Sequence, residues 1–385
     1  MNVNRVRHLE NAISHFDRLS GRQECAKMSI DSHLRAYFRA HKMKLDQSDK
    51  EWLSEKFKDL YRWKGLITHF MQGTASPSNF LRVYFGNTNW RAYANSRTLA
   101  GNICSSMPEE LFKRLTHCFG KDKALDIGKV WNESSVTFLR VNPLVDDRER
   151  VYKFLASKGI SVEKSNVNAI GLRITRSDIL PSLKELKEHS FDIQDESCQM
   201  VGLQIDCNPG DKVLDFCCGS GGKSLVFGPQ LKGKGHLFLH DVNEFYLKQA
   251  KRKLYNAKIR NFSCLTTGSP QLDSLKRKMD WILVDVPSTG SGQFRRYPER
   301  KWLYSDESLQ KHIADQREIF KRALTYLSRK GKIVYSTSSI LPDENMEQVK
   351  HFCESHKLYL VKEPVFSLPQ SHGMDGFFSA VLERR

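Results

Sequence analysis

The chain has 385 residues, of which 39% are hydrophobic, so it is long enough for a sizeable core and for two or three domains. Its 61 Lys and Arg against 44 Asp and Glu give a formal net charge of +17, which favours a polyanionic partner such as nucleic acid or an acidic membrane surface. No apolar run reaches the roughly 18 residues that span a bilayer, so we expect no membrane segment.

The spacing of the nine cysteines and the composition of the N-terminal residues bear on the cellular compartment of the protein. No cysteine falls in a C-x-x-C pair, which argues against a zinc or other metal site and against a disulfide framework. The start mixes Arg5 and Arg7 with Glu10 and Asp17 and has no leading apolar segment, so we expect no secretory signal. We expect an intracellular, reducing compartment, either the nucleus or nucleolus or the cytoplasm, with the mitochondrion left open.

Residues 1 to about 125 favour helices. Within residues 51–71, apolar side chains recur at helical spacing and can share one face. They are Trp52, Phe57, Leu60, Trp63 and Leu66. The sequence predicts a helical N-terminal domain over residues 1–130.

A small α/β module is predicted over residues 131–190. SVTFLRV (135–141) alternates as a strand, and DDRERVYKFLASKG (146–159) has the acidic start and terminal Gly of a helix. GLRIT (171–175) is a second expected strand and SLKELKEHS (182–190) a second helix. A β-α-β-α stretch of this size is typical of half a ferredoxin-like or RNA-recognition unit.

From residue 191 to 385 strands and helices alternate. This order indicates an α/β domain with a mostly parallel, doubly wound sheet. Ligands of such sheets bind beyond the carboxyl ends of the strands. The expected strands are KVLDF (212–216), HLFLH (236–240), NFSCL (261–265), WILVD (281–285), KIVYST (332–337), LYLV (358–361) and FFSAVLE (377–383).

The first of these strands leads into a glycine-rich turn, KVLDFCCGSGGKS (212–224). Glycines let a backbone approach a ligand closely, and the N-terminus of the following helix favours negative groups. Asp241 closes the next strand, where an acid can bind the two hydroxyls of a ribose. The pair predicts a nucleoside cofactor, although the turn is not the G-x-G-x-x-G of NAD-binding proteins.

The fourth strand favours methyl transfer over NAD chemistry. It ends at Asp285 and continues into the small-residue loop VPSTGSG (286–292). A carboxylate there can hydrogen-bond a flat base beside the reactive carbon of the cofactor. The fifth strand ends in a run of hydroxyls within VYSTSSILPDEN (334–345), where catalytic groups would also lie.

A basic and aromatic segment, QFRRYPERKW (293–302), follows the fourth-strand loop. Cations contact phosphates and aromatic faces stack on bases, so this segment predicts RNA contacts. The candidates are Arg295, Arg296, Tyr297, Arg300, Lys301 and Trp302.

Together these motifs resemble the RsmB/Nop/Sun family of RNA 5-methylcytosine methyltransferases. The stretches that carry the resemblance are FDIQDESCQMVGLQIDCNPGDKVLDFCCGSGGKS, DWILVDVPSTGSGQFRRYPERKW, GKIVYSTSSILPDENMEQV, HGMDGFFSAVLER and, for the small module, SSVTFLRVNPLVDDRERVYKFLASKGI. The resemblance implies a Rossmann-like methyltransferase domain, S-adenosylmethionine as cofactor, and rRNA or tRNA, including a ribosome-assembly intermediate, as partner. It also implies an RNA contact at Arg140. The implied cofactor residues are Asp215, Cys217, Cys218, Gly219, Ser220, Gly221, Gly222, Lys223, Asp241 and Asp285.

The chain departs from the family at both catalytic cysteines. Ser288 stands where the family has Cys after the Pro of its fourth-strand motif, and Ser338 where it has Cys after the Thr of the fifth. The cofactor loop reads CCGSGGK rather than Cys-Ala-Ala-Pro-Gly-Gly-Lys. The acid common on the family's third strand is missing from SCLTTGSPQ (263–271).

These departures bear on the reaction, because the family's thiolate adds to C6 of cytosine to activate C5. A thiol with a pKa near 8.5 offers a few per cent thiolate at neutral pH, whereas a serine offers essentially none without an adjacent base. We therefore assign Asp285, Ser288 and Ser338 to the catalytic region and expect the serines not to be nucleophiles. Three interpretations stay open: methylation of a different RNA atom, a catalytically silent RNA-binding assembly factor, and C5 methylation through an unrecognised nucleophile.

Overall fold

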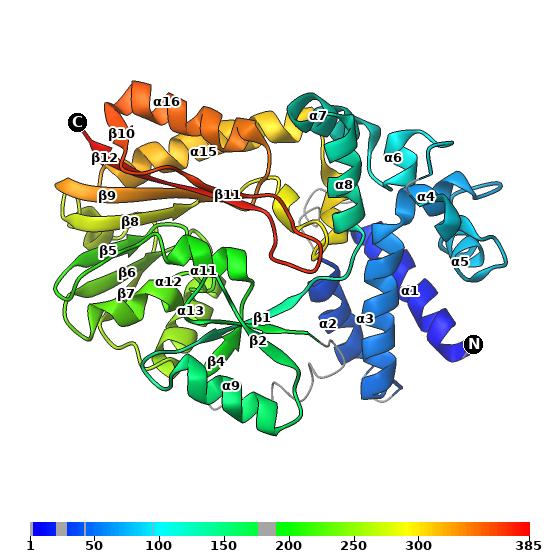
Figure 1. Cartoon of the computed structure of the whole chain (residues 1–385), viewed down its shortest axis with the longest axis horizontal. Coiled ribbons are helices and arrows are strands. Elements are labelled where there is room, and N and C mark those ends of the chain that lie inside the picture. The colour runs from blue at the N-terminus through cyan, green and yellow to red at the C-terminus, as the bar shows by residue number, and fades with distance from the viewer. Residues whose placement is uncertain (1–2, 21–28, 42–43, 95, 176–189) are drawn as a thin grey trace. The chain divides into compact units, whose positions relative to one another are not determined.

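The computed structural model describes residues 3–20, 29–41, 44–94, 96–175 and 190–385, and these divide into two compact units (Figure 1). The first unit holds residues 1–134 and 293–308, and the second holds residues 135–292 and 309–385. The segment 293–308 therefore belongs to the helical unit, although it follows the fourth strand of the sheet domain in sequence.

The first unit is helical. Its elements are α1 (Val3–Ser20), α2 (Ile30–Ala40), α3 (Gln47–Arg62), α4 (Lys64–His69), α5 (Pro77–Phe85), η2 (Trp90–Tyr93), α6 (Gly101–Cys104), α7 (Glu109–Phe119), α8 (Lys121–Trp131) and η6 (Pro298–Leu303). The helical face expected over 51–71 is present but breaks at Trp63, between α3 and α4. Phe57, Leu60 and Leu66 from that face are fully buried in the core of the unit.

The small module of the second unit forms a four-stranded antiparallel sheet in the order β2-β3-β1-β4. Its elements are β1 (Thr137–Val141), α9 (Arg148–Ser157), β2 (Val162–Lys164), β3 (Gly171–Ile174) and β4 (Phe191–Ile193). This is the strand order of a ferredoxin-like sheet. The strands expected at 135–141 and 171–175 and the helix at 146–159 are confirmed. The helix expected over 182–190 lies outside the described residues except for Ser190.

The large sheet has eight strands in the order β10-β12-β9-β8-β5-β6-β7, with β11 beside β12. Strands β5 to β9 pair in parallel, and β12 is antiparallel to each of its neighbours. Its strands are β5 (Lys212–Asp215), β6 (His236–His240), β7 (Phe262–Leu265), β8 (Met279–Asp285), β9 (Leu327–Thr337), β10 (Leu358–Leu360), β11 (Val365–Ser367) and β12 (Phe377–Arg384). All seven expected strands are present, and the Rossmann-like α/β class is confirmed.

Helices cover both faces of this sheet (Figure 1). They are α11 (Glu196–Gly202), α12 (Ser224–Phe227), η4 (Gly228–Leu231), α13 (Glu244–Asn256), α14 (Pro270–Asp273), η5 (Ser291–Gln293), α15 (Asp306–Leu324), η7 (Pro342–Glu344) and α16 (Met346–His356). Phe320 of α15 and Phe352 of α16 pack in the core on one face, and Leu247 and Leu254 of α13 pack in the core on the other. None of the helices in the described ranges is long and apolar enough to cross a membrane.

Candidate functional site

Three acids lie at the carboxyl ends of neighbouring parallel strands. Asp215 ends β5, Asp241 follows β6, and Asp285 ends β8. Because β5 pairs in parallel with both β6 and β8, these ends share one edge of the sheet. That edge includes the point between β5 and β8 where the strand order reverses, which is the ligand site of doubly wound sheets.

The glycine-rich turn lies directly against α13. Gly219 and Gly221 have φ angles of +51° and +79°, a backbone region that glycine adopts without strain. A Cβ on Gly221 would lie 2.9 Å from a methyl of Leu254, so a side chain there would displace the loop. The amide of Gly219 donates to Asp241 Oδ2 at 2.9 Å. Asp241 Oδ1 accepts a hydrogen bond from the amide of Asn243 at 2.8 Å, so this carboxylate joins the glycine-rich loop to the segment that leads into α13.

Asp215 is a buried carboxyl with one oxygen unpartnered. Ser224 Oγ donates to its Oδ2 at 2.7 Å, while no described group bonds to its Oδ1. Burial raises the pKa of Asp215 to about 7, and nearby Asp285 acts in the same direction. An orphaned acceptor of this kind fits a ligand that brings a donor or a positive charge.

Lys223 and Asp285 form an ion pair at the centre of the site. Lys223 Nζ lies 2.6 Å from Asp285 Oδ2, and Ser336 Oγ donates to Asp285 Oδ1 at 3.1 Å. Burial alone would lower the pKa of Lys223, but the charge and hydrogen bond of Asp285, together with Cys198 and Asp215, outweigh burial and the pKa is raised. Both oxygens of Asp285 are thus engaged by groups of this chain.

The two serines at the family's cysteine positions lie on the loops after β8 and β9. Both are half-buried, and Ser288 Oγ accepts a 3.3 Å hydrogen bond from the amide of Gly290. In the described parts of the chain, neither hydroxyl bonds to a histidine or a carboxylate. The arrangement therefore provides no base to activate either serine.

Burial disfavours the thiolate form of the cysteines near the site. Cys217 and Cys218 belong to the cofactor loop, and burial raises the pKa of both thiols. Cys198 of α11 was not singled out from the sequence, yet its thiol is close enough to Lys223 and Asp285 for their charges to affect its pKa, which burial raises overall. Nothing in the sequence around Cys198 marks it, because α11 reaches the site only through the fold.

Arg140 was expected to contact RNA, and the structure corrects this. Its side chain is 1% exposed and donates to Gln194 Oε1 at 2.8 Å, Asp192 Oδ2 at 2.9 Å and the carbonyl of Leu225 at 3.1 Å. Gln194 in turn donates to the carbonyl of Gly222 at 2.8 Å. Arg140 therefore supports the cofactor loop from behind, because a buried guanidinium needs acceptors for its donors.

The segment 293–302 also differs from expectation. Arg295 and Lys301 are fully buried in the helical unit, where Lys301 Nζ donates at 2.9 Å to both the carbonyl of Arg62 and Asn132 Oδ1. Burial lowers the pKa of Lys301 well below its ordinary value. Trp302 is half-buried, and its Nε1 donates to the carbonyl of Tyr61 at 2.8 Å. These residues anchor the segment and do not present a cationic surface.

Three of the expected RNA contacts remain accessible. Arg300 is exposed, with its guanidinium 4.5 Å from the ring centre of Tyr297. Arg296 and Tyr297 are half-buried. This stacked pair and Arg296 keep the character of an RNA-contacting group.

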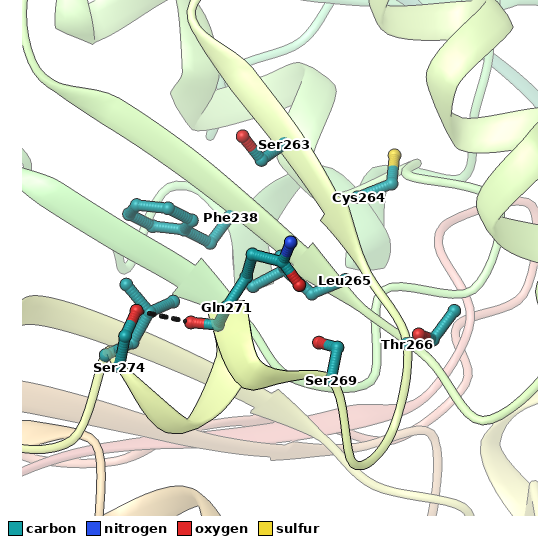
Figure 2. A pocket seen from close by; sticks show the side chains of 9 residues that line it. Phe238, Ser263, Cys264, Leu265, Thr266, Ser269, Gln271 and Ser274 are labelled. Atoms are coloured by element: carbon teal, nitrogen blue, oxygen red, sulfur yellow. Dashed lines mark hydrogen bonds between the residues drawn. The ribbon is translucent and has the colours of Figure 1, made fainter.

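A hollow of about 460 Å³ lies over β6 and β7, on the face where the connection to β8 has only the single turn α14 (Figure 2). Phe238 and Leu265 line it together with polar side chains that include Ser263, Thr266 and Gln271. No charged residue lines it, and the third strand ends in threonines without an acid. No group of three or more His, Cys, Asp or Glu in the described ranges is arranged to hold a metal ion.

The fold and the acids at the strand ends define the class of S-adenosylmethionine-dependent methyltransferases. Solved structures support this fold: the crystal structure of PH0851 matches with a TM-score of 0.80 over 100% of this chain and 99% of its own, at 21% identity. The structure of NSun6 from Pyrococcus horikoshii with SFG matches with a TM-score of 0.65 over 73% of this chain and 99% of its own, at 19% identity.

Sequence comparison gives the family. The family model of the 16S rRNA methyltransferase RsmB/F matches residues 203–383. Ribosomal RNA small subunit methyltransferase B of Pectobacterium carotovorum subsp. carotovorum is 30% identical over 286 residues, and that of Proteus mirabilis 28% over 257. The matches cover 71% and 66% of this chain and 66% and 60% of those relatives, so the chain spans less than two thirds of their length. The chain belongs to the RsmB/Sun family of RNA methyltransferases, whose members use S-adenosylmethionine.

Proposed function

We propose that this protein is an S-adenosylmethionine-dependent RNA methyltransferase that does not use the two-cysteine route to cytosine C5. The observation that carries the proposal is the arrangement of residues at the candidate site. Asp241 with the glycine-rich loop, the orphaned oxygen of Asp215 and the Lys223–Asp285 pair meet at one edge of the sheet, while serine stands at both nucleophile positions. The substrate we propose is ribosomal or transfer RNA, including RNA in a ribosome-assembly intermediate, since the curated relatives are named as ribosomal RNA methyltransferases.

The residues present fit the cofactor. S-adenosylmethionine carries a ribose and positively charged groups, and it supplies the methyl group when bound. Asp241 would hold the ribose hydroxyls, and Asp215 Oδ1 would accept a hydrogen bond from the charged end. The ion pair of Lys223 with Asp285 compensates the charge of its ammonium, which reduces the repulsion that a positively charged ligand group would meet.

An exocyclic amine or a ribose 2′-hydroxyl needs no nucleophile from the protein. Its own lone pair forms the new bond to the methyl carbon as the carbon–sulfur bond breaks, and its proton leaves to a base or to water. Asp285 lies at the strand end where it can accept a hydrogen bond from the reacting group, which orients it. This chemistry is compatible with Ser288 and Ser338.

The second candidate is a silent RNA-binding assembly factor of the same fold. The specific observation in its favour is that both oxygens of Asp285 are already bonded, by Lys223 and Ser336, while both sulfurs of the family are replaced. Binding of RNA without turnover would then be the function.

One experiment separates the two. The full chain is incubated with cellular RNA and isotope-labelled S-adenosylmethionine, and the nucleosides are analysed by mass spectrometry. We expect a labelled nucleoside other than 5-methylcytosine with wild type, and its loss in Asp285→Ala but not in the exposed control Asp273→Ala. Label in 5-methylcytosine would refute the proposal. Absence of label from RNA, with calorimetry showing cofactor binding that Asp241→Ala removes, would favour the silent candidate.

A further inference from the structure

The helix α13 carries an unusual outward face. Its inward residues Leu247, Ala250 and Leu254 are buried in the core of the sheet domain. Lys248, Lys251, Arg252 and Tyr255 are exposed and follow the spacing i, i+3, i+4, i+7, which places them on one side of the helix. Residues 244–260 contain six cations and a single carboxylate, Glu244.

The cations of this face have no carboxylate partner, whereas several exposed lysines on other helices do. Four such lysines pair with an acid three or four positions away on their own helix: Lys113–Glu109, Lys129–Asp126, Lys311–Asp315 and Lys350–Glu347. In the part of the chain that the structure describes, Lys248, Lys251 and Arg252 form no ion pair. Such unpaired charges repel one another, and a polyanion would relieve that repulsion.

Aromatic side chains flank these cations. Phe245 is 64% and Tyr255 61% exposed, although burying a ring of this size is favourable. The guanidinium of Arg260 lies 4.1 Å from the ring centre of Tyr255, which holds the ring outward. Exposed rings between cations are typical of surfaces on which the bases of single-stranded nucleic acid stack.

The helix is also tied to the cofactor site. It starts three residues after Asp241, and its Lys253 donates to Ser220 Oγ of the glycine-rich loop at 2.7 Å. A strand of RNA on the outward face would therefore run along an element that is bonded to the cofactor loop.

We propose that the outward face of α13, defined by Phe245, Lys248, Lys251, Arg252 and Tyr255, forms together with Arg260 of the following loop an RNA-binding surface for a single-stranded segment next to the modified position. This rests on the proposed function, in that the protein binds RNA at all. A membrane surface fits less well, because an interfacial helix inserts its apolar face into lipid and the apolar face of α13 is buried in the core.

The test measures RNA affinity against salt for the full chain, using a fluorescent stem-loop RNA with a single-stranded tail. The triple variant Lys248→Gln, Lys251→Gln, Arg252→Gln removes three exposed cations of the surface. The control Lys276→Gln, Lys311→Gln, Lys350→Gln removes three exposed cations that are ion-paired in the same unit. We expect the slope of log affinity against log salt to become shallower by about 2 in the first variant and to stay unchanged in the control.

The aromatic residues are tested in the same assay. Phe245→Ala with Tyr255→Ala should weaken binding roughly fivefold or more without changing the salt slope, because stacking is lost and charge is not. The control is Tyr359→Ala with Phe366→Ala, two exposed rings elsewhere in the same unit. Calorimetry with S-adenosylmethionine checks that each variant keeps the fold, and the single substitutions of Lys248, Lys251 and Arg252 replace the triple variant if it does not fold.

The outcomes are distinct. Equal slopes in both triple variants, with wild-type RNA binding intact, would overturn this inference alone. Failure of wild type to bind any RNA would overturn the proposed function with it. Binding of wild type to phosphatidylserine vesicles, lost in the α13 triple variant while RNA binding is kept, would overturn it in favour of a membrane surface.

Discussion

Glu344 accepts two hydrogen bonds from Thr289, one from its amide at 2.9 Å and one from its hydroxyl at 2.6 Å. The carboxylate is fully buried in η7, and Gln316 Nε2 donates to it at 2.9 Å and to the carbonyl of Pro287 at 3.1 Å. Glu344 therefore joins the loop that carries Ser288 to the loop that carries Ser338. It acts on the positions of both serines without contacting either.

Replacing this carboxylate should loosen both loops. In Glu344→Gln an amide group faces donors of Thr289 or Gln316, and we expect the free energy of unfolding to fall by about 2–3 kcal/mol. Amide hydrogen exchange at residues 287–291 and 338–341 should speed up together. The control is Glu347→Gln on the exposed face of α16, expected to change stability by about 0.5 kcal/mol or less. Faster exchange in only one loop would show that Glu344 does not couple them.

Arg140 should affect the cofactor and not RNA. Arg140→Lys keeps the charge but loses the fork that holds Gln194, so the support of the Gly222 carbonyl weakens. We expect S-adenosylmethionine affinity to fall by about 1–2 kcal/mol by calorimetry, with the salt slope of RNA binding unchanged. Arg300 is exposed, so Arg300→Gln should make the salt slope of RNA binding shallower and leave the affinity for S-adenosylmethionine unchanged. If the slope of log RNA affinity against log salt became shallower in Arg140→Gln, Arg140 would contact RNA after all and this prediction would be wrong.

Asp215 should make cofactor binding depend on pH near neutrality. Burial raises its pKa to about 7, so the site gains a negative charge as the pH rises through that value. A cationic ligand should bind about tenfold more tightly at pH 8 than at pH 6, because the ionised fraction rises by about that factor. Calorimetry at both values checks this, and Asp215→Asn should abolish the difference. An equal pH dependence in Asp215→Asn would assign it to another group.

Ionisation of Asp215 affects folding in the opposite direction: a rise in pH that strengthens cofactor binding lowers the contribution of this carboxyl to the stability of the fold. Folded Asp215 holds its proton up to about pH 7, while an aspartate in the unfolded chain loses it near pH 4. Between these values the folded state binds more protons, so this contribution to stability decreases as the pH rises through the window. Asp215→Asn should flatten the dependence of the melting temperature on pH over that range.

The serines predict the outcome of covalent trapping. RNA containing 5-fluorocytosine traps an enzyme that adds to C6, because fluorine cannot leave C5 as a proton does. We expect no adduct with wild type, and an adduct with Ser338→Cys and Ser288→Cys combined if the loops hold productive geometry. An adduct with wild type would contradict the argument from the serines. Loss of that adduct in Cys198→Ser would then identify the nucleophile.

Much of the sheet domain was predictable because its signals are local. The strand β6 spans the apolar run 236–240, and the glycines after β5 stand out in the sequence; one of them, Gly221, packs against α13. The strands β2, β4 and β11 were not predicted, since each has only three residues and includes a polar side chain, whereas the equally short β10 lies in the apolar run 358–361.

The buried cations could not be predicted in the same way. Arg140 is the one charged residue of the strand segment SVTFLRV, and Lys301 lies in the basic segment RRYPERKW; neither pattern marks the side chain as buried. Their partners come from far along the chain: Gln194 lies 54 residues from Arg140, and Asn132 lies 169 residues from Lys301. Burial of a charged side chain depends on such partners, and no local pattern reports them.

The burial of Lys301 determines where the chain can be truncated without loss of folding. The segment 293–308 lies inside the region matched by the family model but folds with residues 1–134. A fragment that begins at residue 135 would carry the lysine without the Arg62 carbonyl and the Asn132 amide oxygen that accept its hydrogen bonds. The sheet domain is thus not separable at residue 135 in this protein, because deleting the helical region removes the hydrogen-bond acceptors with which the segment 293–308 folds. Domain shuffling or truncation should therefore be selected against at this boundary.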